Sequence, residues 1–183
     1  TAEDVKEALD LVDERIKVHL SIETKEAWAD LAALRVDERV EAYYLGVLDL
    51  LASMRLPQRI VHLHNPTMHA IMTRFLLECS VVGVLPVSFV FQEYRDTEAF
   101  ENWCLLEKKM GYHAKGCVSP AQVEIANRIF LPSEEELEWA RRVVELFESD
   151  PNCSGFADEA LGFVDEPIYK NASNLLEWAA RKD

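Results

Sequence analysis

Short apolar runs with the character of β-strands alternate with helix-like segments through the first two thirds of this 183-residue chain. Parallel strands are buried on both faces and read as nearly continuous apolar runs, and a crossover that usually carries a helix separates them. The alternation therefore predicts an α/β fold with a parallel sheet covered by helices. We expect strands at 15–22, 40–47, 81–91 and 113–118, and helices at 2–14, 24–34, 66–79 and 97–110.

Two acidic residues, Glu23 and Asp49, stand at the ends of apolar runs and are followed by helix-like sequence. A carboxylate at the carboxyl end of a parallel strand points to the face where α/β barrels place their chemistry. The separation of the two residues fits one strand–helix–strand step. Two such oxygen ligands favour Mg²⁺ over Zn²⁺. The alternative is that both residues only cap the helices that follow them.

Composition limits the classes of partner. The chain has 19 Lys and Arg against 33 Asp and Glu, so its formal net charge is −14. This charge opposes binding to phosphate backbones and to anionic membranes, and we expect neither nucleic acid nor membrane as a partner. We find no long apolar run and no basic-then-apolar leader at Thr1. The four scattered cysteines form no C-x-x-C pair, which favours a reduced, cytoplasmic compartment.

The sequence changes character after Phe130. Ser133 and Glu136 have capping-box spacing, which predicts that a helix begins there. Two neighbouring apolar stripes follow, and they form a wider apolar face than a one-sided surface helix requires. Two readings remain open: a well-packed helix, or a helix held between the main domain and another subunit. A final helix is expected at 168–180.

Several blocks of the chain match, in order, those of a known family. They are Ile22-Glu23-Thr24, Gly46-Val47-Leu48-Asp49-Leu50, the segment 115–123 with Pro120 and Gln122, and Phe163-Val164-Asp165-Glu166-Pro167. On these residues the chain resembles the citrate lyase β-subunit-like (CitE-like) family of the HpcH/HpaI aldolase/citrate lyase superfamily. That family includes malyl-CoA and citramalyl-CoA lyases.

The resemblance implies a fold and a set of roles. Residues 1–131 would be the C-terminal half of a (β/α)₈ TIM barrel, and residues 132–183 a helical C-terminal lid and oligomerisation extension. Glu23 and Asp49 would bind Mg²⁺, and Asp165 would be a catalytic acid/base carried on the lid. We expect a homo-oligomer, a trimer or a hexamer. The amides of Gly46, Val47 and Leu48 would bind a substrate carboxylate, since they lie where a helix begins.

The function that follows is an Mg²⁺-dependent carbon–carbon lyase. It would cleave a 3-hydroxyacyl-CoA thioester such as malyl-CoA or citramalyl-CoA to a 2-oxo acid and an acyl-CoA. The chain has Ser119 where many members have His, and Ser88-Phe89 where they have Asp-Gly, so we expect a divergent specificity. The alternatives are a non-catalytic or regulatory ligand-binding relative and a CoA-independent pyruvate aldolase.

Overall fold

The structure is a computed structural model of the chain, and it describes residues 1–150 and 153–180. The chain divides into two compact units, Thr1–Phe130 and Leu131–Asp183. Each unit has an apolar core of its own. The boundary expected from the sequence, after residue 131, lies next to this division. We describe each unit by itself.

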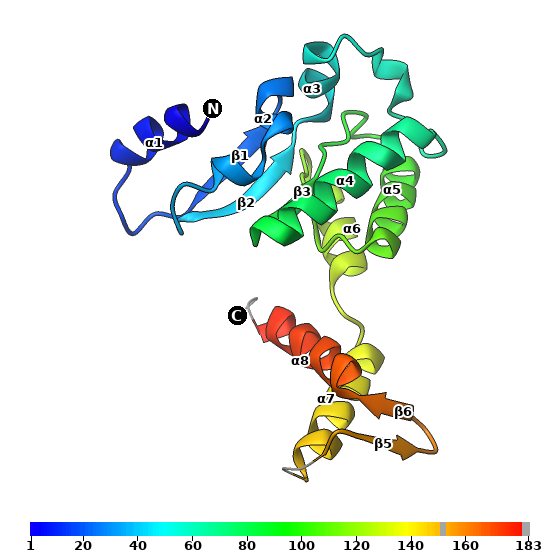
Figure 1. Cartoon of the computed structure of the whole chain (residues 1–183). Coiled ribbons are helices and arrows are strands. Elements are labelled where there is room, and N and C mark those ends of the chain that lie inside the picture. The colour runs from blue at the N-terminus through cyan, green and yellow to red at the C-terminus, as the bar shows by residue number, and fades with distance from the viewer. Residues whose placement is uncertain (151–152, 181–183) are drawn as a thin grey trace. The chain divides into compact units, whose positions relative to one another are not determined.

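The first unit contains a four-stranded sheet in which every neighbouring pair is parallel (Figure 1). The strands lie side by side in the order in which they occur in the chain. Each connection is therefore a crossover that joins a strand to its parallel neighbour. The strands are β1 (Val18–Ile22), β2 (Val40–Leu45), β3 (Leu85–Ser88) and β4 (Ala114–Lys115). The prediction of a parallel sheet with helical crossovers is confirmed.

Helices precede and connect these strands. They are α1 (Ala2–Asp10), α2 (Lys25–Ala29), α3 (Val47–Ser53), α4 (Pro66–Val82), α5 (Thr97–Met110) and α6 (Pro120–Phe130), with short 3₁₀ turns at Ala32–Leu34 and Gln58–Ile60. Side chains cap the two long ones: Asn65 Oδ1 accepts from the N–H groups of Thr67 and Met68, and Asp96 Oδ1 accepts from Ala99 N–H. Helix α6 is absent from the elements that the sequence predicted. Within 1–150 and 153–180, no helix combines the length and apolar character that a membrane crossing requires.

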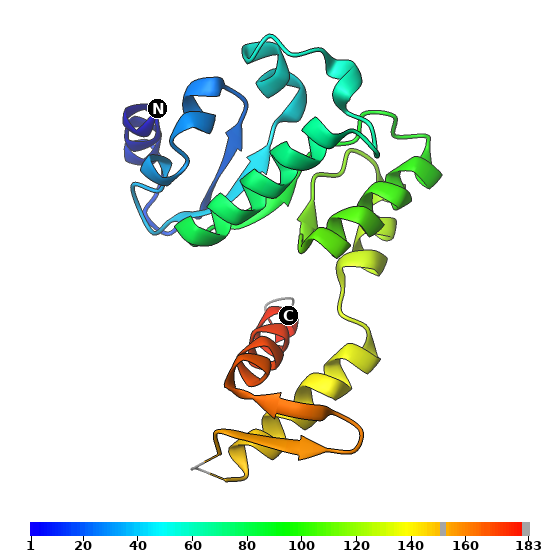
Figure 2. The ribbon, with the colours of Figure 1, turned by 45° about the vertical axis from the view of Figure 1, so that its right-hand side comes forward.

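The two faces of the sheet have different surroundings. Ile22, Tyr43 and Leu45 point into the core, where the Tyr43 hydroxyl donates to the Leu31 carbonyl at 3.1 Å. Helix α4 packs on β3 and lies across the strands in both views (Figures 1 and 2). On the other face His19 is exposed and its ring stacks on that of Tyr44, with centroids 5.7 Å apart. This second face is the one that carries the polar side chains of β1.

Several predicted elements have different bounds in the structure. The expected helix 24–34 is interrupted at Asp30, whose Oδ1 accepts from Ala33 N–H and starts a new turn. The expected strand 81–91 covers only Leu85–Ser88, because Val81 and Val82 still belong to α4. That helix ends at Gly83, which has a φ of 79° that favours glycine. The elements expected at 2–14, 15–22, 40–47 and 113–118 are also shorter in the structure.

The second unit combines two helices and a hairpin. Its elements are α7 (Glu134–Glu148), the antiparallel pair β5 (Gly155–Asp158) and β6 (Gly162–Asp165), and α8 (Glu166–Ala180). Both bonds of the predicted capping box are present, from Glu136 N–H to Ser133 Oγ at 3.1 Å and from Ser133 N–H to Glu136 Oε2 at 2.7 Å. Both helices expected in this part of the chain are present, and the hairpin between them is an element that the sequence analysis did not predict. Val164 of the hairpin packs in the core with Ala140, Val143 and Ala172 of the two helices.

Candidate functional site

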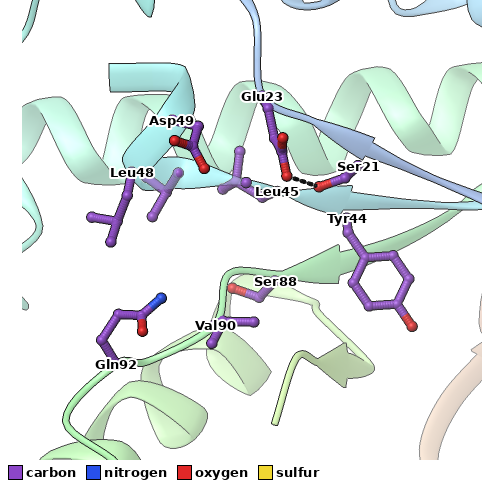
Figure 3. A pocket seen from close by; sticks show the side chains of 11 residues that line it. Ser21, Glu23, Tyr44, Leu45, Leu48, Asp49, Ser88, Val90 and Gln92 are labelled. Carbon is purple, nitrogen blue, oxygen red and sulfur yellow. Dashed lines mark hydrogen bonds between the residues drawn. The ribbon is translucent and has the colours of Figure 1, made fainter. Parts of the chain in front are cut away.

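One pocket of about 190 Å³ lies at the carboxyl ends of β1, β2 and β3. Both carboxylates predicted from the sequence line it, together with residues from all three strand ends (Figure 3). Its lining residues are Ser21, Glu23, Tyr44, Leu45, Gly46, Val47, Leu48, Asp49, Ser88, Val90 and Gln92. The structure therefore brings Glu23 and Asp49 to the same pocket, at the edge of the sheet where parallel α/β folds bind ligands.

Glu23 follows directly on the end of β1. Ser21 lies two residues earlier, and side chains alternate along a strand, so both project from the same face of the sheet. The Ser21 hydroxyl donates to Glu23 Oε1 at 2.7 Å, as the dashed line in Figure 3 marks. This bond orients the carboxylate toward the pocket while leaving it accessible to a ligand.

Asp49 occupies a different position from the one that the sequence suggested. Strand β2 ends at Leu45, and α3 begins at Val47, so Asp49 lies in the first turn of the helix and not at the tip of the strand. The helix forms because Val47, Leu50 and Leu51 are buried at helical spacing. A carboxylate in the first turn is also favoured by the helix dipole, so the helix-start role and a ligand role are compatible.

Gly46 lets Glu23 lie against the turn between β2 and α3. A Cβ atom at position 46 would clash with Glu23 Cγ and lie 3.1 Å from Glu23 Oε1, so any other residue would displace this carboxylate. The Gly46 N–H donates to the Ile22 carbonyl at 3.1 Å, so this predicted carboxylate-binding amide already has a backbone acceptor. The amides of Val47 and Leu48 belong to the first turn of α3, where no intrahelical acceptor exists.

The residues at this pocket suit a hard divalent cation. Mg²⁺ is commonly held by one or two carboxylates, with water and substrate oxygens completing the octahedron. Glu23 and Asp49 supply such a pair, since both carboxylates line the pocket. In the part of the chain that the structure describes, no three His, Cys, Asp or Glu side chains gather into a metal-binding group. A site of the zinc type is thus not indicated among these residues.

A buried polar network adjoins the pocket through Ser88. The Ser88 hydroxyl donates to Glu107 Oε1 at 2.7 Å, and Lys115 Nζ lies 2.6 Å from the same oxygen. The side chains of Glu107 and Lys115 are both fully buried. Burial raises the pKa of Glu107, and the Lys115 ammonium opposes this shift.

Sequence reasoning missed this network, although one signal was present. Glu107 continues the buried stripe that Phe100, Trp103 and Cys104 form on α5, at helical spacing. A carboxylate on an apolar stripe has to find a partner or become neutral. The identity of that partner depends on β4, which the chain reaches only after the helix.

Asp165 is the last residue of β6 and belongs to the second unit. Its Oδ1 accepts from Ile168 N–H at 3.2 Å, so it caps the first turn of α8. The pocket of Glu23 and Asp49 lies in the first unit. The role of Asp165 as an acid/base stays a prediction.

Comparison with curated proteins finds several relatives, whereas no family model matches the chain. A (3S)-malyl-CoA thioesterase of Cereibacter sphaeroides is 32% identical over 130 residues, which are 69% of this chain and 44% of that protein. A citrate lyase subunit beta-like protein of Mycobacterium tuberculosis is 28% identical over 104 residues, 57% of this chain and 37% of that protein. The chain spans about half the length of these curated relatives or less.

Solved structures share the fold over almost the entire chain. Protein CitE from Mycobacterium tuberculosis, in complex with magnesium, acetoacetate and coenzyme A, matches with a TM-score of 0.74 and 23% identity. The match covers 98% of this chain and 65% of that one. A citrate lyase from Burkholderia xenovorans matches with a TM-score of 0.80 and 21% identity over 98% of this chain and 59% of that one.

Proposed function

This chain belongs to the citrate lyase β-subunit-like family, and on that premise we propose that it is part of an Mg²⁺-dependent carbon–carbon lyase. The substrate would be a 3-hydroxyacyl-CoA thioester of the malyl-CoA or citramalyl-CoA type. The products would be a 2-oxo acid and an acyl-CoA. The observation that carries the proposal is the shared pocket of Glu23 and Asp49.

The architecture of the whole enzyme is part of the proposal. The four parallel strands with their helices would be the second half of a (β/α)₈ barrel, and the second unit would be its lid. Support comes from the strand order and from the solved neighbours, of which this chain covers 59 to 65%. The pocket at the carboxyl ends of the strands then corresponds to the catalytic face of such a barrel.

Each group in the pocket has a task in the proposed reaction. Glu23 and Asp49 would hold Mg²⁺, which supplies Lewis acidity toward the carboxylate and hydroxyl oxygens of the substrate. The amides of Val47 and Leu48 would orient the substrate carboxylate at the start of α3. The Ser21 hydroxyl keeps Glu23 in place by donating to its Oε1.

Asp165 would be the acid that protonates the α-carbon of the thioester. When the carbon–carbon bond breaks, the hydroxyl group gives its proton to water and becomes the carbonyl of the 2-oxo acid. The bonding electron pair stays with the α-carbon of the thioester as an enolate. Asp165 would donate a proton to that carbon, a role that requires the lid to close over the substrate.

Thioester hydrolysis is a second candidate function, because the relative with 32% identity is named a (3S)-malyl-CoA thioesterase. In that reaction, water adds to the thioester carbonyl, the carbon–sulfur bond breaks, and the CoA thiol leaves with a proton. The same pair of carboxylates would serve the same substrate class. The two reactions give different products, which makes them easy to separate.

The test uses the full-length protein with Mg²⁺ and either malyl-CoA or citramalyl-CoA, and it measures free 2-oxo acid and free thiol in parallel. A lyase releases the 2-oxo acid without free thiol, whereas a hydrolase releases thiol without the 2-oxo acid. Glu23→Gln should abolish either activity. Glu41→Gln is the matched control, since Glu41 is an exposed carboxylate of β2 that pairs with Lys17. Absence of both products would favour the non-catalytic alternative.

We also propose that the second unit takes part in a homo-oligomer, a trimer or a hexamer. Phe163 of the hairpin is 66% exposed, and Trp139 on α7 is only partly buried. An additional apolar face of this kind is suited to a neighbouring subunit. Light scattering on the full-length protein tests this, and a monomer at micromolar concentration would contradict it.

A further inference from the structure

We infer that Glu107, Lys115 and Gln122 are positioning residues for the loop that follows β3 and forms one side of the pocket. They would set the affinity for the substrate while leaving the affinity for the metal unchanged. Val90 and Gln92 of this loop line the pocket. The inference rests on the proposed function only for the identity of the ligand.

Two buried side chains donate hydrogen bonds to alternate backbone carbonyl groups of the loop. Lys115 Nζ donates to the Phe89 carbonyl at 2.9 Å, and Gln122 Nε2 donates to the Phe91 carbonyl at 3.0 Å. Val90 lies between these two points. Both donors belong to the next strand–helix unit, since Lys115 is the last residue of β4 and Gln122 lies in the first turn of α6.

Close packing holds Val90 as well. A Cβ atom at Gly116 would be 2.7 Å from Val90 Cγ2, so only glycine lets the loop approach this closely. The Gly116 N–H donates to the Ser88 carbonyl at 3.0 Å and extends the ladder between β3 and β4. The segment after β4 therefore serves as a fixed support for the loop.

The ammonium group of Lys115 contacts a carboxylate, a backbone carbonyl and an aromatic ring. It contacts Glu107 Oε1 at 2.6 Å and the Phe89 carbonyl at 2.9 Å, and it lies 3.9 Å from the centre of the Phe89 ring. The second carboxylate oxygen of Glu107, Oε2, is buried and has no hydrogen-bond partner among the residues that the structure describes. Burial accordingly raises the pKa of Glu107.

The buried ion pair contributes little to stability, but it fixes the positions of the residues around it. Replacing a buried ion pair by apolar residues of similar volume is often neutral or stabilising, since desolvation offsets the attraction. The pair does, however, define where Ser88 and Phe89 lie, because Ser88 Oγ donates to the same Glu107 oxygen at 2.7 Å. It thereby connects α5, β3 and β4 at the carboxyl edge of the sheet.

Gln122 provides a second, uncharged connection. Its side chain is fully buried, and its Oε1 accepts from Val118 N–H at 2.8 Å while its Nε2 holds Phe91. The amide thus joins the segment before α6 to the loop after β3. Figure 3 shows Val90 and Gln92 on the opposite side of the pocket from Glu23 and Asp49. A shift of the loop would change the space for the substrate and leave the carboxylates in place.

The experiment compares the full-length wild type with the double variant Glu107→Leu/Lys115→Met. Four quantities are measured: the unfolding temperature, the affinity for Mg²⁺ alone, the affinity for pyruvate at saturating Mg²⁺, and the NMR shift of the Val90 methyl groups. We expect the unfolding temperature to be unchanged or higher and the Mg²⁺ affinity to stay within about twofold. Pyruvate affinity should fall roughly tenfold, and the Val90 signals should move and broaden.

The control removes an exposed ion pair between α5, the helix that carries Glu107, and α6, the helix that carries Gln122. Arg128 on α6 lies 3.1 Å from Glu101 on α5, with side chains 62% and 36% exposed. Glu101→Gln/Arg128→Gln should change neither pyruvate affinity nor the Val90 shifts. Gln122→Met, which breaks only the uncharged connection, should weaken pyruvate binding in the same direction and serves if the double variant does not fold.

Unchanged Val90 shifts in a folded variant would overturn the inference, as would unchanged pyruvate affinity beside altered shifts. An equal loss of Mg²⁺ and pyruvate affinity would also overturn it, since that pattern indicates general distortion. A wild type that binds neither probe would count against the proposed function instead. The Val90 shifts of the variants would then still decide whether these residues position the loop.

Discussion

The first unit holds two carboxylate sites at the same edge of its sheet, and they differ in burial and in the group that faces the glutamate. In both, a serine hydroxyl donates to a glutamate oxygen at 2.7 Å, Ser21 to Glu23 and Ser88 to Glu107. Glu107 is buried and meets the ammonium of Lys115. Glu23 is exposed and meets a second carboxylate, Asp49, across a pocket. Only the open site lacks a positive partner among its lining residues.

Burial explains why we propose a side-chain cation at one site and a bound metal ion at the other. A carboxylate removed from water requires a permanent partner, and even with Lys115 beside it the pKa of Glu107 is raised by desolvation. Two carboxylates at an open pocket remain hydrated, so under our proposal they would be able to bind and exchange a metal ion. The buried site would then position the loop, and the open site would hold the metal for the reaction.

The largest effect should come from the proposed acid/base, and it tests whether the open site separates metal binding from proton transfer. Asp165→Asn should cut turnover with a CoA thioester by roughly 10²–10⁴-fold while leaving Mg²⁺ affinity nearly unchanged. Glu23→Gln should lower both together, because it removes a ligand. Steady-state kinetics and metal titration of the full-length variants check this. Wild-type turnover of the Asn variant at saturating substrate and Mg²⁺ would remove Asp165 from the mechanism.

At the buried site, we expect the effects of changing Glu107 and Lys115 on stability to depend strongly on each other. Glu107→Leu alone should destabilise the protein by about 3–5 kcal/mol, because it leaves the Lys115 ammonium buried without a counter-charge. The double change with Lys115→Met should restore this loss in full. Urea unfolding of the single and double variants measures the coupling. If the two single changes were additive, the pair would not be the unit that we describe.

An intermediate effect is expected at Gly46, where the open site depends on close packing. In Gly46→Ala the new methyl group would meet Glu23 Cγ, so the side chain of Glu23 has to move. We expect Mg²⁺ affinity to fall about tenfold, or about 1.4 kcal/mol, with the fold retained. Calorimetric titration with Mg²⁺ measures it, and Glu41→Gln serves as the control for charge. Unchanged affinity would show that the position of Glu23 is not critical.

The smallest effect is expected at the exposed ion pair between Arg128 and Glu101. Glu101→Gln should change the free energy of unfolding by less than about 1 kcal/mol, because solvent screens such pairs. The change should shrink further as salt is added. Thermal unfolding at low and high ionic strength is sufficient. A loss comparable to that of Glu107→Leu would show that burial is not what separates the two kinds of pair.

The sequence by itself determined the features that depend on near neighbours. Alternating apolar runs and helix-like segments predicted the parallel sheet, and the spacing of Ser133 and Glu136 predicted the start of α7. The position of Glu23 directly after an apolar run placed it at the end of a strand. These patterns reflect local periodicity and capping, which act over a few residues.

Other features were decided only by the tertiary structure. Asp49 was expected at a strand tip, but burial of Val47, Leu50 and Leu51 draws its segment into a helix. The hairpin of β5 and β6 has four-residue strands whose pairing depends on the helices beside it. The partnership of Glu107 with Lys115 and the contact of Gly46 with Glu23 join separate elements. Such contacts are set by which side chains are buried together, and local sequence patterns do not contain that information.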